Sequence, residues 1–581
     1  MPPIQFTATE FSTIDLSSGI ERLGPQANKP GNARLSAGTN CRFTSEGGCK
    51  NRTGFEEKGD LGTSAKIDTL ESMKTQVFEI MGAKSNTAVK QSLDGITWYD
   101  VGLTQTAAER SFLFPYGKNL YVLNQTDAGV RIAVSTLRVA ITVASTEVEI
   151  RTGDGSEFAS SGAIYIEGDE IDYTGRSTDQ LTGVTNIGAS HAVGTIITQT
   201  TTPSGFPKGT TMDELEGSAL VGGVSSNPST VYYSAPSSND NPEYFYDFSN
   251  NGAGAKLLGH DVTCIKAGER VAMIGTKGGI YYSTGFEPTT GALETFLLSS
   301  VHTVNNAFCI AEMDREFAIL TDEGRILPAM QTDAGFALID DPNNPRNNMD
   351  FPVAKYIKDN KDDDQGLSWL HYDPVTRELT ASIIIDGISQ HFIYQRDIGA
   401  WSIDTSKPYS GMANFNSRVY AGSDSDDKVY LDRETTANDG IPIITRMVTG
   451  IMSADQRRST VDYLNLTFGG LLSAIGQFTF RILVNGEQIL EELVTAEDLI
   501  NEGLMTLDSG VPIGAGTVGA QTLGSSGDPI EAFNFTYPYE FMAEGENIQI
   551  EWEIEDEGPQ FELRDFKLEG ESENETLLQS Q

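Results

Sequence analysis

Short segments in which hydrophobic and polar residues alternate recur along most of the chain, separated by Gly, Asn, Asp and Pro. This period of two is typical of β-strands with one buried face, and the separating residues favour tight turns. Such segments occur in pairs: 219–223 with 229–234, 270–275 with 279–283, 316–320 with 324–327, 379–385 with 391–394, and 417–422 with 428–431. Pairs that recur roughly every 40 to 60 residues indicate the radial blades of a β-propeller. The span from about Cys41 to Thr435 therefore predicts roughly six to eight blades of ~45 residues each.

Residues 91–102 contain the clearest turn signal, the pair Asp94-Gly95. An Asp-Gly pair supplies the positive φ angles that a two-residue hairpin turn requires. After it, Ile96, Trp98 and Val101 alternate with polar residues, which predicts a half-buried strand. The pattern Ser-x-Asp-Gly-x-Thr-Trp in this stretch resembles the Asp-box of β-propeller blades, shortened by one residue.

The pattern of blades is interrupted once and ends before the C-terminus, and these changes suggest the domain boundaries. We expect an extended arm over 1–39, a first part of the propeller over 40–136 that opens with a hairpin around Gly47-Gly48, and an inserted small β domain over 137–203. The propeller resumes over 204–440, longer strands over 441–570 predict a C-terminal β-sandwich, and 571–581 is expected to be a mobile acidic tail. The best helical pattern, 489–503, is isolated, so the predicted class is all-β.

A formal net charge of −42 argues against sequence-independent nucleic-acid binding, which depends on Lys and Arg neutralising phosphates. The plainer interpretation is that the charge keeps a large β protein soluble, while an acidic wall could also let DNA slide past without sticking. The sequence begins without a signal-peptide pattern and contains no apolar run of membrane-spanning length, so we expect no export signal and no membrane span.

Few residues of the sequence suggest a catalytic, metal-binding or ligand-binding role. The five histidines (191, 260, 302, 371 and 391) have no metal-binding spacing, and no nucleophile or phosphate-loop motif occurs. The acidic groups Asp359 with Asp362–Asp364, and Asp424 with Asp426 and Asp427, could bind calcium, but solvated turns are the commoner role of such runs. The tryptophans 98, 369, 401 and 552 could form sugar platforms, but their strand patterns favour core positions. Cys41 and Cys49 could pair across a hairpin or remain thiols, and Cys264 and Cys309 are expected in the core.

An Asp-box also raises the hypothesis of a sialidase-like enzyme. Such an enzyme needs converging arginines, a Tyr–Glu pair and an acid, and these cannot be assembled from this sequence, in which Lys and Arg together number 40. We therefore expect no catalytic residues, no metal, no cofactor and no enzymatic activity.

Several short sequence segments resemble those of the tail nozzle and head-closure proteins of tailed bacteriophages, including the packaged-DNA stabilisation proteins of short-tailed phages. They are residues 40–43 with 51–55, 227–234, 322–326 and 399–402, and the phrases 167–174 and 181–184 resemble small β domains of phage structural proteins. The likeness covers roughly 40–470 and leaves out the C-terminal sandwich and the Gly-rich segment 507–528.

The resemblance implies a structural virion protein, made in the host cytoplasm, that forms a homo-oligomeric ring, hexameric or higher, below the portal. DNA would pass through the ring without specific binding, and portal, adaptor and other tail proteins would be its neighbours. The acidic residues would then face the DNA, and basic groups such as Arg457-Arg458 would contact acidic neighbours. The alternative is a receptor- or glycan-binding propeller at a virion or cell surface, for which a trimer is the expected assembly.

Overall fold

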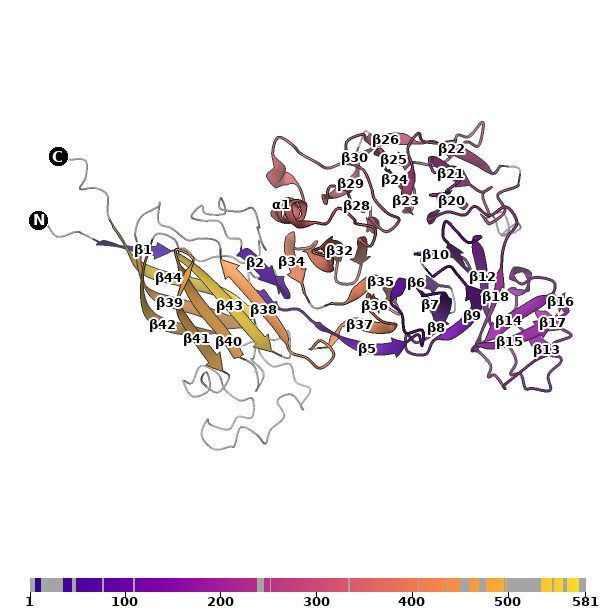
Figure 1. The fold of residues 1–581 in the computed structure, drawn as a ribbon, viewed down its shortest axis with the longest axis horizontal. Helices are drawn as coiled ribbons and strands as arrows, with labels where there is room; N and C mark the ends of the chain where they lie inside the picture. The colour runs from indigo at the N-terminus through magenta and orange to yellow at the C-terminus, as the bar shows by residue number, and fades with distance from the viewer. Residues whose placement is uncertain are drawn as a thin grey trace, which may run out of the picture.

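The structure is a computed structural model of the 581-residue chain. It describes residues 6–11, 35–43, 49–75, 78–107, 110–237, 245–250, 252–332, 335–405, 407–435, 437–449, 459–469, 477–495, 498, 534–545, 548–556 and 562–573. Nearly all the regular structure in these ranges is β, and α1 (Phe351–Asn360) is a short helix. A ring of small sheets lies beside a layered β unit that contains the first and the last strand of the described residues (Figure 1).

In the described part of the chain, seven sheets form the blades of a β-propeller, each built outward from an inner strand by antiparallel neighbours. Blades one to three are β6 (Ile67–Lys74), β7 (Glu79–Ser85), β8 (Ala88–Ser92), β9 (Tyr99–Thr104); β10 (Phe112–Tyr116), β11 (Asn119–Leu123), β12 (Val130–Thr136), β18 (Ile196–Thr201); and β19 (Thr211–Leu215), β20 (Ser218–Gly222), β21 (Thr230–Tyr233), β22 (Gly254–Leu257). Blades four and five are β23 (Val262–Ala267), β24 (Ala272–Thr276), β25 (Gly279–Ser283), β26 (Phe296–Ser299); and β27 (Ile310–Met313), β28 (Glu316–Leu320), β29 (Ile326–Thr332), β30 (Gly335–Leu338). The predicted all-β propeller is confirmed, and seven blades fall within the predicted six to eight.

Blades six and seven join the ends of the ring. They are β31 (Trp369–Asp373), β32 (Glu378–Ile385), β33 (Ile388–Gln395), β34 (Ala400–Asp404); and β35 (Tyr409–Phe415), β36 (Arg418–Ser423), β37 (Lys428–Thr435), β5 (Gly54–Asp60). The outer strand of blade seven, β5, comes from the N-terminal side of blade one, and its antiparallel pairing with β37 closes the ring. Closure by strand pairing removes two open sheet edges that would otherwise be exposed.

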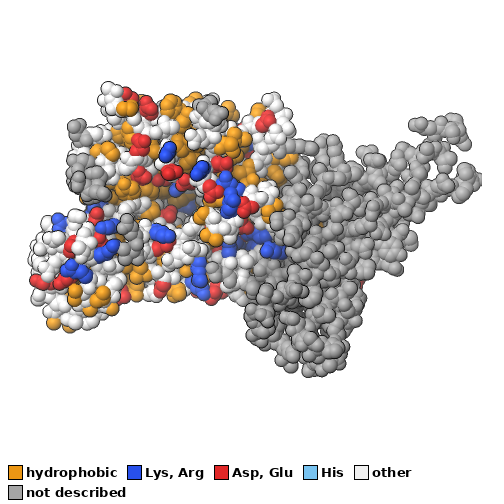
Figure 2. Space-filling model, turned by 180° about the vertical axis from the view of Figure 1, so that it is seen from behind, with side chains coloured by type: hydrophobic (Ala, Val, Ile, Leu, Met, Phe, Trp, Pro, Cys, Tyr) orange, Lys and Arg blue, Asp and Glu red, His pale blue; other side chains and the backbone are white. Residues whose placement is uncertain are grey.

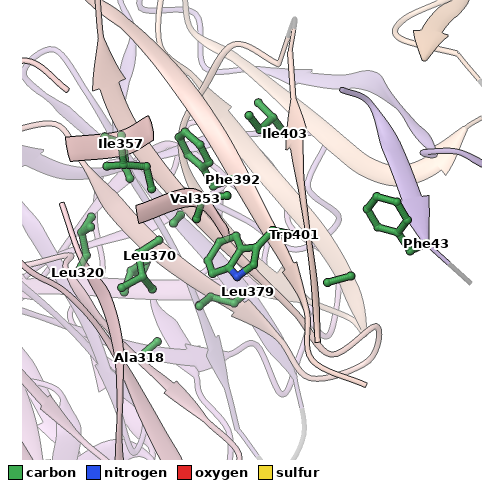
Figure 3. Close-up of a cluster of buried hydrophobic side chains, with 14 of the residues drawn as sticks. Phe43, Ala318, Leu320, Val353, Ile357, Leu370, Leu379, Phe392, Trp401 and Ile403 are labelled. Atoms are coloured by element: carbon green, nitrogen blue, oxygen red, sulfur yellow. The ribbon is translucent and has the colours of Figure 1, made fainter. Parts of the chain in front are cut away.

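The blades are held together by hydrophobic side chains between neighbouring sheets. Around blade six the core contains Trp401, whose Nε1 donates a hydrogen bond to the Met349 carbonyl oxygen at 2.8 Å. The side chains of Val353 and Ile357, on α1, pack against this core, which also contains Leu379 and Phe392 (Figure 3). The helix therefore serves as a lid on one blade, and it was not predicted from the sequence.

The insertion lies between the third and fourth strands of blade two. Its strands are β13 (Glu147–Glu149), β14 (Gly162–Ile166), β15 (Asp169–Tyr173), β16 (Gly175–Ser177) and β17 (Gln180–Thr182), with the 3-10 turn η2 (Gly155–Glu157). It has a core of its own, which includes Val148, Ile164 and Leu181. The predicted boundary at 203 is wrong, because β18 is the fourth strand of blade two and also pairs with β14. Alternation alone could not assign β18, because pairing with β12 of the blade and pairing with β14 of the insertion require the same period of two.

Two sheets form the C-terminal β-sandwich. One contains β3 (Cys41–Phe43), β4 (Cys49–Asn51), β44 (Glu562–Glu573), β39 (Ser459–Gly469) and β42 (Asn534–Gly545), with β1 (Phe6–Phe11) on β44. The other contains β2 (Leu35–Thr39), β38 (Ile443–Thr449), β43 (Ile548–Asp556), β40 (Gln477–Val484) and β41 (Glu487–Thr495).

Several expectations for the ends of the chain are corrected by these sheets. The residues expected as an extended arm include β1 and β2, which pair with the C-terminal strands β44 and β38. The hairpin of β3 and β4 belongs to the sandwich, so the propeller begins at β5 and not at residue 40. Residues 489–495 of the predicted helix 489–503 are instead part of β41, because pairing with β40 supplies their backbone hydrogen bonds. The remainder, apart from Asp498, lies outside the described residues. β44 reaches Glu573, and the rest of the expected tail, the segment 507–528 and Arg457-Arg458 lie outside the described residues.

The propeller and the sandwich share one continuous sheet. Blade six continues through β34 into β2 and the second sandwich sheet, giving the order β31-β32-β33-β34-β2-β38-β43-β40-β41. The joint is a parallel bridge between Thr39 and Ile403, next to a hydrogen bond from the Asn40 N–H to the Ile403 carbonyl oxygen at 2.7 Å. The two units are therefore joined by backbone pairing as well as by the chain itself.

Candidate functional site

Two groups of charged side chains in the described residues are candidates for a functional site. The first lies around a space of about 330 Å³, which we call the axial cavity and which is lined by side chains of β6, β10, β23, β27, β31 and β35 and by Arg110, Ala307 and Phe308. The second, the junction network, lies where blades six and seven meet the sandwich, and its charged members are Arg42, Arg52, Asp404, Lys407, Asp432, Arg433, Glu378 and Asp373.

One end of the axial cavity holds Lys266 among carboxylates. Its Nζ lies 3.5 Å from Oδ2 of Asp213, and Glu71 and Glu312 are close enough to interact electrostatically with it. Burial raises the pKa of all three carboxyl groups, and the attraction of Asp213, followed by Glu71 and Glu312, raises the pKa of Lys266. The lysine charge is therefore well compensated at this end.

The other charged group of the cavity, Arg110, precedes β10. Its guanidinium carbon lies 3.7 Å from the ring centroid of Phe308. Its Nε donates to the Asp68 carbonyl oxygen at 3.1 Å, and its Nη2 donates to the Ser410 carbonyl oxygen at 3.2 Å. The carboxylate of Asp68 is instead 2.6 Å from Nζ of Lys84. Burial lowers the pKa of Arg110 to about 10, so the group remains protonated at neutral pH.

In the junction network, almost every charged side chain is paired with one of opposite charge. Asp404 accepts two hydrogen bonds from Arg42, from Nη1 at 2.7 Å and Nη2 at 2.8 Å, and its Oδ2 lies 3.0 Å from Nζ of Lys407. The same Nζ donates to Oδ1 of Asp432 at 2.9 Å, and Nε of Arg52 lies 3.8 Å from Asp404. Burial opposes the charge of Asp404, but Arg42 and Lys407 outweigh it and hold the pKa of this carboxyl well below its usual range. Such a network fixes the geometry of the joint and offers no open position for a reactant.

The acidic groups considered for calcium serve as turn acceptors. Asp362 accepts from the N–H groups of Asp386 and Gly387 at 3.0 and 2.8 Å, which fixes the turn between β32 and β33. Asp427 accepts from the N–H groups of Thr63 and Ser64, both at 2.5 Å. Within the described ranges, no group of three or more His, Cys, Asp or Glu is arranged to hold a metal ion.

The Asp-box is a local structure of blade one. Asp94 Oδ1 accepts from the N–H groups of Ile96 and Thr97, both at 2.8 Å, and these bonds hold the loop between β8 and β9. The predicted two-residue hairpin is wrong, because β8 ends at Ser92 and β9 begins at Tyr99. Ile96 is exposed and not half-buried, since it lies in this loop.

Of the remaining candidate residues, Trp369 and His371 line the axial cavity, and the others lie elsewhere. Trp369, Trp401 and Trp552 are buried, and Trp98 packs partly buried against the core between blades seven and one. All four cysteines are buried thiols. The histidines are dispersed: His191 of the insertion lies 2.8 Å from Oε2 of Glu167 and 3.2 Å from Oδ2 of Asp169, while burial lowers the pKa of His371 and His391 to about 4.

The sequence interpretation missed Arg110, Lys266 and the members of the junction network. Arg42 and Arg52 stand in the segments 40–43 and 51–55, but no local motif indicates the buried charge partners of any of these residues, because each obtains its environment from strands distant in sequence. Arg42, for example, bonds to a residue 362 positions away.

Comparison with known proteins gives no assignment. Neither the families of known proteins nor the curated proteins contain a match to this chain. Among solved structures, the computationally designed Ika8 protein is similar at 10% identity and a TM-score of 0.31, over 65% of this chain and 99% of its own. Sqt1 of Chaetomium thermophilum is similar at 11% identity and a TM-score of 0.30, over 66% and 97%. The exo-beta-1,3-galactanase of Phanerochaete chrysosporium has 9% identity and a TM-score of 0.23, over 89% and 100%. At these scores the likenesses carry no argument about function.

Proposed function

We propose that this chain is a structural protein of a bacteriophage tail, which assembles into a homo-oligomeric ring, a hexamer, below the portal and helps to retain the packaged genome while leaving a path for DNA. The supporting observation is that three of the phrases resembling tail nozzle and head-closure proteins meet at the junction network. They are residues 40–43, 51–55 and 399–402. Arg42 contacts Ser402 and Asp404, and Arg52 contacts Asn40 and Asn438.

A rigid joint suits a ring component, because each subunit must hold its two units at a fixed angle for the ring to close. Backbone pairing across β34 and β2, together with the buried charges of Arg42, Asp404 and Lys407, provides such a joint. Bonds of this kind are broken only by exposing unpaired buried charges, which is costly.

The distribution of charge suggests which unit would face DNA. Residues 441–581 hold 25 Asp and Glu against 6 Lys and Arg, so the C-terminal part carries much of the net charge of −42. On the face of the propeller in Figure 2, acidic and basic side chains are interspersed. We infer that the sandwich side faces the DNA path, where carboxylates repel phosphates at close range and salt screens the repulsion over about 10 Å.

No helix of the described residues is long and apolar enough to cross a membrane.

Native mass spectrometry and negative-stain microscopy of the purified chain test the proposal. We expect closed rings of six subunits with a central channel, and antibody labelling of phage particles at the junction of head and tail. A monomer under all conditions, or labelling elsewhere on the particle, would contradict it. A trimer located at the tip of a fibre would favour the receptor-binding alternative.

The proposal is of a structural protein, so it also predicts no turnover. Purified chain is expected to release no sugar from sialosides or from β-1,3-linked galactans. Hydrolysis that a single carboxylate substitution abolishes would contradict the prediction.

A further inference from the structure

We propose that the axial cavity binds a small carboxylate ligand with an apolar body, and that the ligand carboxylate pairs with Arg110. This inference is independent of the ring assembly, because the cavity lies within a single propeller.

The charge of Arg110 is not paired with any described carboxylate. The buried arginines of the junction network, Arg42, Arg52 and Arg433, each have a carboxylate oxygen within 3.8 Å. Arg110 has only carbonyl acceptors and the Phe308 ring, and within the described residues no carboxylate lies within ion-pair distance of it. A partly buried guanidinium without a counter-ion costs free energy that an anionic ligand would recover.

Two donors at the cavity are also without acceptors. Nη1 of Arg110 and Nε1 of Trp369 are buried, and neither has a hydrogen-bond partner in the described structure. Both residues line the cavity, and Trp369 is 2% exposed. An unpaired buried donor is costly, so an acceptor oxygen of a ligand that reaches either group would recover that cost.

The rest of the wall decides the class of anion. Phe112, Leu113, Phe308, Leu370 and Met412 form the apolar part of the lining, and polar or charged residues such as Thr69, Glu71 and Asn414 form the rest. A ligand that carries both a charged group and an apolar body matches such a mixed wall better than an inorganic anion does. A volume of about 330 Å³ is at the lower end of small-molecule sites. A carboxylate on a compact aryl or alkyl body therefore fits better than phosphate.

The opposite end of the cavity fixes the orientation. Glu71 and Glu312 lie near Lys266, which Asp213 already neutralises. A ligand carboxylate placed there would face like charges, so it is directed toward Arg110 and its apolar body occupies the space between.

The test compares phenylacetate with its neutral isostere phenylacetamide on the full-length protein, by isothermal titration calorimetry and ligand-observed NMR. We expect phenylacetate to bind and phenylacetamide to bind about tenfold or more weakly, the size of one charge-assisted hydrogen bond. In Arg110→Gln, phenylacetate should lose about the same factor while phenylacetamide is unchanged. The matched control is Arg138→Gln, which removes an exposed arginine paired with Glu149 in the insertion and should change neither affinity.

Equal affinity for the acid and the amide, or no binding of phenylacetate by the native chain, would overturn the inference. Binding of inorganic phosphate that depends on Arg110, without binding of phenylacetate, would overturn the carboxylate class. If circular dichroism shows that Arg110→Gln does not fold, the ratio of the two probes on the native chain decides, since it needs no variant.

Discussion

Replacing Asp404 by Asn tests whether the junction network holds the propeller to the sandwich. The substitution preserves the shape of the side chain and removes one negative charge, on which Arg42, Lys407 and Arg52 converge at 2.7, 3.0 and 3.8 Å. All four side chains are nine-tenths or more buried. Asn also presents an NH₂ group where two oxygens accept from cations. Removing one partner of a buried ion pair typically costs about 3–5 kcal/mol, and we expect a loss of that size in the free energy of unfolding.

Urea unfolding followed by circular dichroism measures the loss, and limited proteolysis shows where it occurs. Cleavage is expected first near the joint of β34 and β2, because the network lies beside it. The matched control is Glu149→Gln, which removes a carboxylate paired with the exposed Arg138 and should cost about 0.5 kcal/mol or less. In a double-mutant cycle, Lys407→Met should cost less in the Asp404→Asn background than in the native chain. A loss below about 1 kcal/mol for Asp404→Asn, or strict additivity with Lys407→Met, would refute the reasoning.

Three further predictions concern acid, one glycine and the N-terminal strands. Burial lowers the pKa of His391 to about 4, below the ~6.5 of an unfolded chain, so the unfolded state takes up the proton first as the pH falls. The neutral His391 therefore contributes at most about 3 kcal/mol to the free energy of unfolding above pH ~6.5, and this contribution should be lost as the pH falls toward 4. The urea midpoints of the native chain and of His391→Gln should accordingly converge between pH ~6.5 and pH ~4, and a constant difference between them would contradict the prediction. In Gly95→Ala a Cβ would lie 2.4 Å from the Tyr420 ring at a φ of +74°, whereas Gly117→Ala, at +60°, meets nothing within 4 Å. The first should therefore lower the free energy of unfolding by about 1–3 kcal/mol more than the second, and equal losses would count against the contact. Deletion of residues 1–40 removes β1 and β2, and we expect protease-sensitive, aggregating protein because β38 and β44 lose their partners; a deletion variant as protease-resistant as the native chain would show that these strands are dispensable.

The alternation along the chain was sufficient to predict an all-β propeller, because a strand with one buried face must repeat every two residues wherever it lies. The strand pairs 219–223 with 229–234 and 417–422 with 428–431 correspond closely to β20 with β21 and β36 with β37. Buried positions for Trp369, Trp401 and Trp552 also follow from their strand patterns. These features depend on near neighbours in the chain, so the sequence contains enough information to predict them.

The partners of distant segments could not be predicted in the same way. Nothing in residues 54–60 indicates that they complete the last blade, and nothing in residues 6–11 indicates that they pair with β44, because any alternating strand offers the same backbone hydrogen bonds. The candidate sites depend even more on distant pairing. Arg42 and Arg110 are ordinary arginines in the sequence. Only the closed ring surrounds Arg42 with carboxylates and places Arg110 at a cavity where no described carboxylate pairs with it. The sequence by itself determined the kind of strand and the approximate number of blades. Tertiary structure decided ring closure, the joint with the sandwich and the environment of each buried charge, because these depend on contacts between residues hundreds of positions apart.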